Sequence, residues 1–248
     1  MKIIQITDLH VGKENEDTFG VDVRVNCANI LAKAKTLRPD VIVFTGDMCF
    51  RDPQRGIYEW LFPQIDALQI PYKVISGNHD DSPMMAQVFK QTDLLKEGEL
   101  YYKEKWGDWP VLFLDTSTAY LSQPQLKWVE KQLSKLEDKV LIFMHHPPIK
   151  CGVSYMDNKH AMQHKKQIQK LIYAFPGQVN VFCGHYHVEK VIRSQNMLLH
   201  VTPSCFFQIS QQHEHFEPDH RRIGLREITL EGNQLMSTVH YYKGKKLT

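Results

Sequence analysis

The sequence lacks long hydrophobic runs, paired cysteine motifs and blocks of basic residues, and each absence excludes a class of protein. Its longest apolar runs fall far short of the roughly 20 residues that a membrane-spanning helix needs. The five cysteines, an odd number, are never spaced C-x-x-C, so we expect neither a disulfide framework nor a zinc ribbon. The formal net charge is only +2, with no basic stripe of the kind that nucleic-acid-binding proteins use. We therefore expect no membrane and no nucleic-acid partner.

The chain also shows no secretory leader, internal repeat, low-complexity tract or linker. A candidate ligand, Asp8, already follows the first predicted strand, which leaves no room for a cleaved segment. We interpret the cysteines as reduced, mostly buried thiols, as is usual in a reducing compartment. These features predict a cytoplasmic protein in which residues 1–248 form a single domain. The oligomeric state stays open, a homodimer included.

Histidine, by contrast, is abundant, with 13 copies. Five short apolar runs predict strands, and each is followed by side chains that can bind metal ions. The runs span residues 3–7, 41–45, 72–76, 140–144 and 179–183. The side chains that follow them are Asp8, His10, Asp47, Asn78, His79, Asp80, His145, His146, His185 and His187. Ligands of parallel sheets gather at the carboxyl ends of the strands, so we expect these groups to converge around Asp47.

The segments between these strands predict helices. A helix that starts after residue 20 and stops before Pro39 is expected to carry one apolar face, made of Val21, Val25, Ala28 and Leu31 or Ala32. Asp52 and Ser82 are each followed by proline, which predicts an N-cap and a first-turn proline for two more helices. Residues 149–159 predict an irregular, substrate-facing loop.

The remaining patterns predict a second group of strands. Gly107-Asp108 predicts the turn of a hairpin between residues 100–105 and 111–115, and the last third predicts strands at 197–201, 224–230 and 235–242. A helix that starts at Ser122 and another through Ile168 supply apolar stripes for packing. The sequence thus predicts an α/β fold with a two-sheet β-sandwich core flanked by helices.

A cluster of carboxylate, imidazole and carboxamide groups indicates a site for borderline divalent ions. Mn, Fe, Zn and Co accept such mixed ligands, whereas a pure calcium or magnesium site would avoid so many histidines. Two ions about 3.5–4 Å apart can hold a bridging hydroxide and clamp a phosphoryl oxygen. The pattern therefore predicts hydrolysis of a phosphate ester, with Asp47 shared by two ions.

These motifs together resemble the calcineurin-like metallophosphoesterase superfamily. The resemblance rests on Asp8-x-His10, Gly46-Asp47, Gly77-Asn78-His79-Asp80, His145 and Gly184-His185-x-His187, in the family's order and across most of the chain. It is greatest to the bacterial class III 3′,5′-cyclic-nucleotide phosphodiesterases, through His145-His146-Pro147-Pro148, Tyr155-Met156-Asp157 and residues 202–208. It implies the superfamily's four-layer fold and a phosphodiesterase that acts on cAMP or related small phosphodiesters by attack of a metal-bridging hydroxide.

The resemblance also implies a role for each site residue. One metal would be held by Asp8, His10, Asp47 and His187, and the other by Asp47, Asn78, His145 and His185. The ions would be two divalent metals, Mn, Fe or Zn, as a matched or mixed pair. Catalytic His79 would protonate the leaving alkoxide or stabilise charge on the phosphate, and it would bind substrate together with Asn78. Tyr155 is a candidate wall for a nucleobase, whereas we interpret Phe206 first as a core residue.

More than one function fits these residues. A glycerophosphodiesterase carries the same motifs, so the residues alone do not separate it from a cyclic-nucleotide phosphodiesterase. The retromer scaffold subunit shares the fold as a protein-binding platform, but it lacks much of the ligand set that is complete here. Some members of the superfamily are nucleases, and the absence of a basic stripe argues against that activity.

The role of a few single residues also stays open. His146 could replace His145 as the ligand, but in the family the ligand directly follows the strand. The remaining histidines, His160 and His200 among them, are interpreted as surface or satisfied polar residues. Relatives have a longer insertion where only residues 117–120 separate Thr116 from Leu121, so the pocket is expected to be more open on this side.

Overall fold

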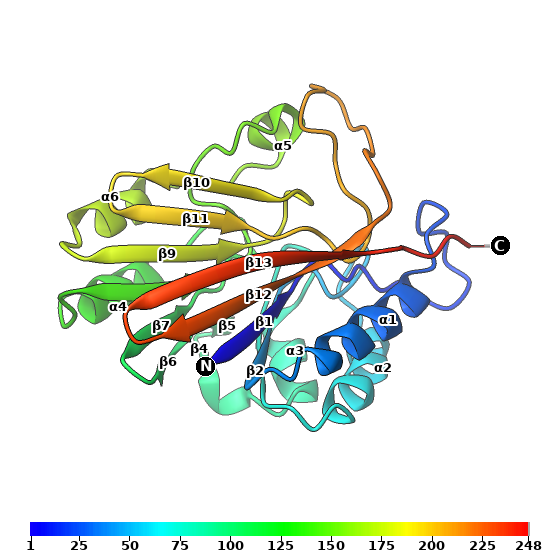
Figure 1. Ribbon diagram of the computed structural model, residues 1–248, viewed down its shortest axis with the longest axis horizontal. Helices are drawn as coiled ribbons and strands as arrows, with labels where there is room; N and C mark the ends of the chain where they lie inside the picture. The colour runs from blue at the N-terminus through cyan, green and yellow to red at the C-terminus, as the bar shows by residue number, and fades with distance from the viewer. Residues whose placement is uncertain (248) are drawn as a thin grey trace.

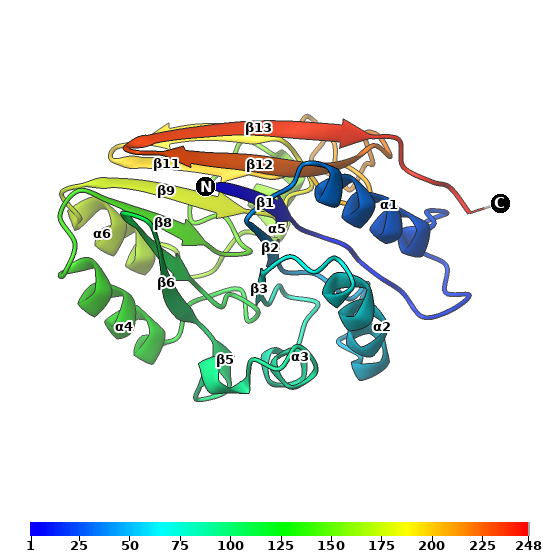
Figure 2. The same ribbon diagram turned by 60° about the horizontal axis from the view of Figure 1, so that its bottom comes forward.

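The computed structural model describes residues 1–247 and contains two large β-sheets packed face to face (Figures 1 and 2). The five-stranded sheet has the order β13-β12-β1-β2-β3. Its strands are β1 (Lys2–Ile6), β2 (Val41–Thr45), β3 (Tyr72–Ile75), β12 (Ile223–Glu231) and β13 (Gln234–Tyr242). The first three are parallel, and β12 and β13 are added antiparallel to β1.

The six-stranded sheet has the order β10-β11-β9-β8-β7-β6. Its strands are β6 (Tyr102–Trp106), β7 (Trp109–Phe113), β8 (Lys139–Phe143), β9 (Gln178–Cys183), β10 (Lys190–Ser194) and β11 (Met197–Val201). The four inner strands are parallel, and the edge strands β6 and β10 are antiparallel to their neighbours. A short ribbon of β4 (Leu95–Lys96) and β5 (Glu99–Leu100) lies beside a 3₁₀ turn, Thr92–Leu94.

Helices cover the outer faces of both sheets, which gives four layers (Figure 2). Helices α1 and α2 lie on the side of the five-stranded sheet, while α4 and α6 lie on the side of the six-stranded sheet. The helices are α1 (Val23–Thr36), α2 (Arg55–Asp66), α3 (Ser82–Val88), α4 (Gln123–Leu133), α5 (Ser154–Lys159) and α6 (Lys166–Ala174). The predicted α/β fold with a two-sheet core flanked by helices is confirmed. Among the described residues, no helix is long and apolar enough to cross a membrane.

A row of stacked rings lines the inner face of the six-stranded sheet. Strand register places Tyr102, Phe113, Phe143, Phe182 and His200 side by side on five neighbouring strands. Successive ring centroids are 4.5, 5.4, 5.3 and 4.6 Å apart, with interplanar angles of 22° or less. Phe113, Phe143 and Phe182 pack in one core cluster with apolar residues of β1, β2 and β12, so the row joins the two sheets.

The predicted helix starts need correction. Helix α2 begins at Arg55 after Gln54, not at Asp52-Pro53, and α3 takes its N-cap from Asp81, one residue before Ser82. The Asp81 carboxylate accepts a hydrogen bond from the Met84 amide at 2.7 Å, and this bond decides where the helix starts.

Further predictions were wrong about burial and local order. Helix α1 buries the face that contains Cys27 and Ile30, whereas Val25 and Ala28 are exposed. The segment 149–159 is not wholly irregular, because it contains α5. His200 is 4% exposed, and neither of its ring nitrogens has a hydrogen-bond partner within residues 1–247, so it is neither a surface nor a satisfied polar residue.

Candidate metal centre

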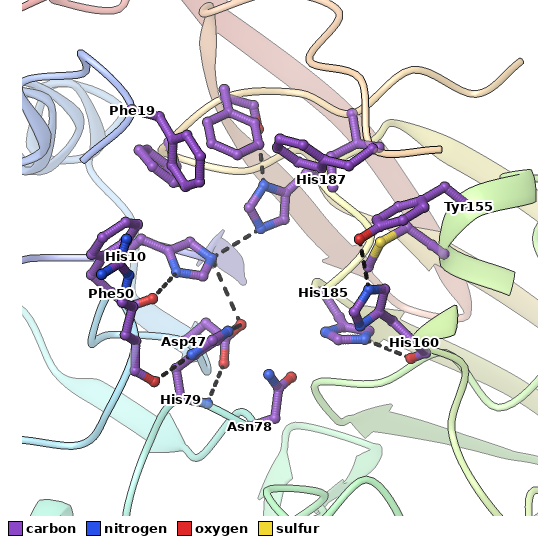
Figure 3. Close-up of a pocket in the computed structure, with 16 residues that line it drawn as sticks. His10, Phe19, Asp47, Phe50, Asn78, His79, Tyr155, His160, His185 and His187 are labelled. Carbon is purple, nitrogen blue, oxygen red and sulfur yellow. Dashed lines mark hydrogen bonds and ion pairs between the residues drawn. The ribbon is translucent and has the colours of Figure 1, made fainter. Parts of the chain in front are cut away.

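The predicted site residues converge where strands of both sheets end (Figure 3). The five-stranded sheet delivers them from the ends of β1, β2 and β3, and the six-stranded sheet from the ends of β8 and β9. In Figure 3 His10, Asp47, Asn78, His185 and His187 surround one central space. The predicted convergence around Asp47 is confirmed as a spatial arrangement.

Asp8, His10 and His187 form a first group of possible ligands. The His187 Nε2 atom lies 3.3 Å from Asp8 Oδ1 and 3.0 Å from His10 Nε2. The backbone amide of His185 donates to both oxygens of the Asp8 carboxylate at 3.1 and 3.0 Å, which fixes the carboxylate's orientation. The group is buried and offers two nitrogens and one carboxylate to a single point.

Asp47, His145 and His185 form a second group. The Asp47 Oδ2 atom lies 3.2 Å from His145 Nε2, and it also lies 3.7 Å from His10 Nε2 in the first group. Asp47 Oδ1 accepts a hydrogen bond from the His79 amide at 3.0 Å. Asp47 therefore lies between the two groups, which is the geometry that a shared carboxylate requires.

The backbone is unusual at these positions. Asp8, His10, Asp47, His185 and His187 have φ values between 45° and 67°, in the left-handed region that residues other than glycine rarely adopt. Such conformations cost free energy and persist only where the surrounding structure enforces them. Here they turn the chain inward directly after each strand and aim the side chains at one point.

A close approach between two loops explains the adjacent glycines. A Cβ atom on Gly77 would collide with Asp47, and one on Gly46 would lie 2.5 Å from the Gly77 amide nitrogen. Glycine at both positions lets the loops after β2 and β3 touch, so that Asp47 and Asn78 reach the same space.

Backbone carbonyls fix the tautomers of the site histidines. His145 Nδ1 donates to Thr45 O at 2.7 Å, and His187 Nδ1 donates to Phe207 O at 3.0 Å. The other bonds of this kind run from His10 Nδ1 to Phe50 O, from His185 Nε2 to His160 O and from His79 Nδ1 to Arg51 O. A carbonyl only accepts, so the bonded nitrogen carries a proton and the other nitrogen is the one that can turn to a metal ion. Metal-binding histidines are held in this way.

Burial and the neighbouring charges shift the pKa values of the site residues in opposite directions. Burial alone would raise the pKa of Asp8, but the neighbouring His187 imidazole outweighs burial and lowers it to about 2. Burial opposes a charged His145, yet Asp47 raises its pKa to about 9. Burial lowers the pKa of both His10 and His185 to about 3, so these two imidazoles stay neutral.

The residues present fit two divalent metal ions. The lone pairs of His10 Nε2 and His187 Nε2 face each other at 3.0 Å, an arrangement that repels unless a cation lies beside both. His145 Nε2 is buried and makes no hydrogen bond within residues 1–247, although Asp47 lies close to it. The neutral imidazoles of His10 and His185 and the ionised carboxylates are in the protonation states that metal binding requires, whereas His145, with its raised pKa, would release a proton to a metal ion.

The neighbouring candidates lie in different places. Asn78 is exposed and lines the cavity together with His79, whose Nε2 atom is 3.9 Å from Asp47 Oδ2. His79 also belongs to a possible metal group with His10 and Asp47. His146 points away, because its Nδ1 atom pairs with the Thr116 hydroxyl at 3.0 Å.

A cavity of about 390 Å³ opens beside the two groups. Tyr155 lines it as predicted, and its hydroxyl lies 3.0 Å from His160 Nε2. Phe206 is buried as predicted, but it also lines the cavity, with its ring 5.2 Å from that of His10. Cys49 and Cys183 are buried and unpaired, and neither belongs to the metal groups found among the described residues.

The sequence interpretation missed several functional neighbours. His160 was dismissed, yet its carbonyl holds His185 and its ring lines the cavity. Asp80 was seen only as part of a motif, but it accepts bonds from the amides of Met48 and Gly77. Phe19 lines the cavity from a loop that carried no prediction, and its one signal was a large apolar residue in a polar segment.

Residues 1–189 match the family model of the calcineurin-like phosphoesterases. The chain is 31% identical over 209 residues to a probable cyclic nucleotide phosphodiesterase of Fibrobacter succinogenes, covering 84% of this chain and 81% of the relative. It is 26% identical over 250 residues to the 3′,5′-cyclic adenosine monophosphate phosphodiesterase CpdA of Escherichia coli, covering 96% and 88%. It is 29% identical over 266 residues to the glycerophosphodiester phosphodiesterase GpdQ of Enterobacter lignolyticus, covering 97% and 92%.

Among solved structures, a dimetal phosphatase from Danio rerio shares the fold. The TM-score is 0.71 at 12% identity, over 100% of this chain and 96% of that chain. The family match and the relatives confirm the predicted resemblance and the predicted enzyme class, a metal-dependent hydrolase of phosphate esters. Because the family model covers well over half of its residues, this chain belongs to the calcineurin-like phosphoesterase family.

Proposed function

We propose that this protein hydrolyses small phosphodiesters, 3′,5′-cyclic nucleotides among them, at a centre of two divalent metal ions. The observation that carries the proposal is the position of Asp47 between two buried groups of imidazole and carboxylate ligands. Free lone pairs from both groups point into one space beside an open cavity. A shared carboxylate at this place suits two ions that act on one phosphoryl group.

Two ligand sets follow from this arrangement. Asp8, His10, Asp47 and His187 would hold one ion, and Asp47, Asn78, His145 and His185 the other. The donors suit Mn, Fe or Zn, as a matched or a mixed pair. Asn78 would complete the second set from the loop after β3, where it is exposed and lines the cavity.

The protein's own residues would complete the reaction. When bound, the ions supply Lewis acidity to the phosphoryl group and lower the pKa of water. His79 stands at the rim of the site with its Nδ1 proton held by Arg51 O. In its protonated form it would donate the Nε2 proton to the leaving alkoxide, which otherwise departs as a poor leaving group. Asn78 and His79 would both contact the substrate phosphate.

The names of the relatives guide the choice of substrate. They include both cyclic-nucleotide and glycerophosphodiester phosphodiesterases, at similar identities to this chain. We favour cyclic nucleotides because the cavity beside the metal groups carries aromatic side chains on which a base can rest. Tyr155 would contribute to this wall.

The test combines metal analysis with a substrate panel. The purified protein should carry about two equivalents of divalent metal, and with saturating Mn²⁺ it should hydrolyse cAMP and bis(p-nitrophenyl) phosphate better than the monoester p-nitrophenyl phosphate. Brisk turnover of glycerophosphodiesters without detectable cAMP hydrolysis would overturn the cyclic-nucleotide assignment. Absence of both metal and turnover would favour the scaffold role.

We also infer a reducing compartment and keep the predicted cytoplasmic location. All five cysteines are unpaired and buried, as expected of a protein in a reducing compartment, where disulfides rarely persist. A homodimer stays a prediction.

A further inference from the structure

An aromatic wall forms one side of the cavity, and it is built by segments far apart in the chain. Phe19 comes from the loop after β1, Phe50 from the loop after β2, and Phe207 and Phe216 from the region between β11 and β12. The Phe19 ring lies 5.9 Å from Phe50, 5.8 Å from Phe207 and 5.8 Å from Phe216. Phe19 therefore joins the other rings into one surface, which we call the phenylalanine wall.

Phe19 is not explained by the core. Its side chain is 51% exposed, and its backbone adopts the left-handed region with a φ of 53°. Exposing a large apolar side chain to water is unfavourable, and a left-handed backbone conformation at a bulky residue adds a further cost in free energy. A ligand that covers the ring would recover part of the cost of exposure. Figure 3 shows Phe19 and Phe50 on the same side of the cavity as His10.

The wall continues directly into the metal centre. Phe206, which lies 4.1 Å from Phe207, has its ring 5.2 Å from His10, and the Phe207 ring lies 5.4 Å from His187. A phosphodiester bound at a metal ion that the first group of ligands would hold could thus place an organic substituent against these rings. Two polar side chains border the wall: the Arg51 guanidinium lies 4.9 Å from the centre of the Phe50 ring, and the Tyr155 ring lies 5.9 Å from that of Phe216.

We propose that the phenylalanine wall is a subsite for a planar aromatic substituent of the phosphodiester, and that Phe19 is its main specificity-determining residue. The inference rests on the proposed function and narrows its substrates to phosphodiesters with an aromatic substituent. A phenyl ring offers a stacking face but no donor or acceptor for the edge of a base. The subsite therefore selects nucleoside or aryl diesters over glycerol diesters, and it does not distinguish adenine from guanine.

The first experiment compares wild type with Phe19→Ala on four diesters: cAMP, cGMP, bis(p-nitrophenyl) phosphate and glycerophosphoethanolamine. Loss of one stacking side chain typically costs a base about 1–3 kcal/mol, so KM for the three aromatic substrates should rise roughly tenfold while kcat changes little. The kinetic constants for glycerophosphoethanolamine should not change. Wild type should turn over cAMP and cGMP within about threefold of each other.

Matched variants separate recognition from folding. Phe19→Trp keeps an aromatic ring at this position and should have a KM close to that of wild type. Val191→Ala is the control, because it removes an apolar side chain of similar exposure from the edge strand β10 and should leave the kinetic constants unchanged. An equal loss on aromatic and glycerol substrates, or a strong preference for one purine, would overturn the inference.

A binding measurement keeps the subsite testable apart from turnover. If no diester were hydrolysed at saturating Mn²⁺, the proposed function would fail. Calorimetry would then compare the affinity of the protein for AMP with its affinity for glycerol 3-phosphate. Wild type should bind AMP at least about tenfold more tightly, and Phe19→Ala should lose that advantage. Equal affinity of wild type for the two ligands would contradict the aromatic subsite itself.

Discussion

At the scale of single residues, the site depends on proton positions that the backbone imposes. Each of the imidazoles near the centre donates one ring proton to a carbonyl, so that the other nitrogen is the one turned toward the shared space. Asp47 lies nearer to both ligand groups than Asp8 does: Asp47 Oδ2 is 3.2 Å from His145 Nε2 and 3.7 Å from His10 Nε2, whereas Asp8 Oδ1 is 3.9 Å from His145 Nε2. The consequences of removing it should therefore differ from those of removing any other ligand.

Asp47→Asn should lose both metal ions, because one substitution weakens both sets of ligands. His187→Ala, which belongs to one set only, should keep close to one equivalent. The fall in kcat/KM for Asp47→Asn should exceed the roughly 10–100-fold cost of losing a residue that merely orients a ligand. Metal content by mass spectrometry and turnover of bis(p-nitrophenyl) phosphate measure both effects. Asp66→Asn, an exposed aspartate on α2, is the control; full metal content in Asp47→Asn would contradict the shared role.

His79→Ala should separate chemistry from metal binding. If His79 protonates the leaving group, its loss should cost about 10²–10⁴-fold in kcat for cAMP, whose ribose alkoxide leaves poorly. Turnover of bis(p-nitrophenyl) phosphate should suffer much less, because nitrophenolate needs no proton. The exposed His213→Ala serves as the control. Loss of metal in His79→Ala would instead support the third group, in which His79 is a ligand.

His200 should make the folded state sensitive to acid. Burial lowers its pKa to about 3, with the Arg226 guanidinium adding to the effect, against about 6.5 in the unfolded chain. Between these values the unfolded state binds the proton and the folded state does not, so stability is complete above pH 6.5 and falls as the pH drops toward 3. The expected loss from this residue is about 2 kcal/mol between pH 6.5 and 5.

Urea unfolding of the metal-free protein at pH 7 and pH 5 measures this effect. His200→Phe would keep an aromatic ring at the end of the stacked row and remove the titrating group, so its stability should fall less between the two pH values. The difference between pH values isolates His200, since metal ligands titrate equally in both proteins. An identical pH dependence in wild type and variant would show that His200 is protonated in the folded state.

At the scale of elements, a buried carboxylate joins the loops after β2 and β3. Asp80 accepts bonds from the amides of Met48 at 3.2 Å and Gly77 at 3.0 Å, and from the Tyr58 hydroxyl at 3.0 Å. The same hydroxyl accepts a bond from the Asp81 amide at 3.0 Å. Helix α2 thereby braces both loops that carry the central ligands.

Tyr58→Phe should loosen this brace. One buried and one partly buried hydrogen bond lose their shared partner. The loss should lower the free energy of unfolding by about 1–3 kcal/mol and weaken metal binding, since both ligand loops gain freedom. Tyr173→Phe removes a hydroxyl that pairs with Ser194 at 2.9 Å on the other side of the molecule, and it should leave metal affinity unchanged. Thermal melts measure the stability of both variants, and metal titrations measure their affinity for metal ions. Unchanged metal affinity in Tyr58→Phe would show that the hydrogen bonds of Tyr58 do not support the metal centre.

At the scale of the whole molecule, the two sheets depend on each other. The five-stranded sheet pairs β1 with β12, which comes from the far end of the chain, and its core continues into Phe143 and Phe182 of the other sheet. The ligand set also draws on both sheets. We therefore propose that residues 1–248 form one cooperative domain.

The metal-free protein should unfold in a single transition. Circular dichroism reports on both sheets, while the tryptophans lie in α2, β6, β7 and α4, so the two signals sample different parts of the molecule. Their urea midpoints should coincide if the sheets unfold together. Two separated transitions would divide the chain into two domains.

The sequence by itself determined the strands that carry the site and the identity of the converging side chains, but not the order of the strands in the two sheets or the edge strand β10. A strand that is buried on both faces appears in the sequence as an apolar run, and the polar residue at its end can be recognised from its immediate neighbours. Asp8, Asp47 and His145 were therefore predicted correctly to be neighbours in space. Tertiary structure decided what local patterns do not contain. Val25 and Ala28 continue a helical stripe with Leu31, yet α1 buries Leu31 together with Cys27 and Ile30 and leaves Val25 and Ala28 exposed. Phe19 and His160 acquire roles only when distant loops meet at the cavity, and the tautomers of the histidines follow from carbonyls up to 100 residues away.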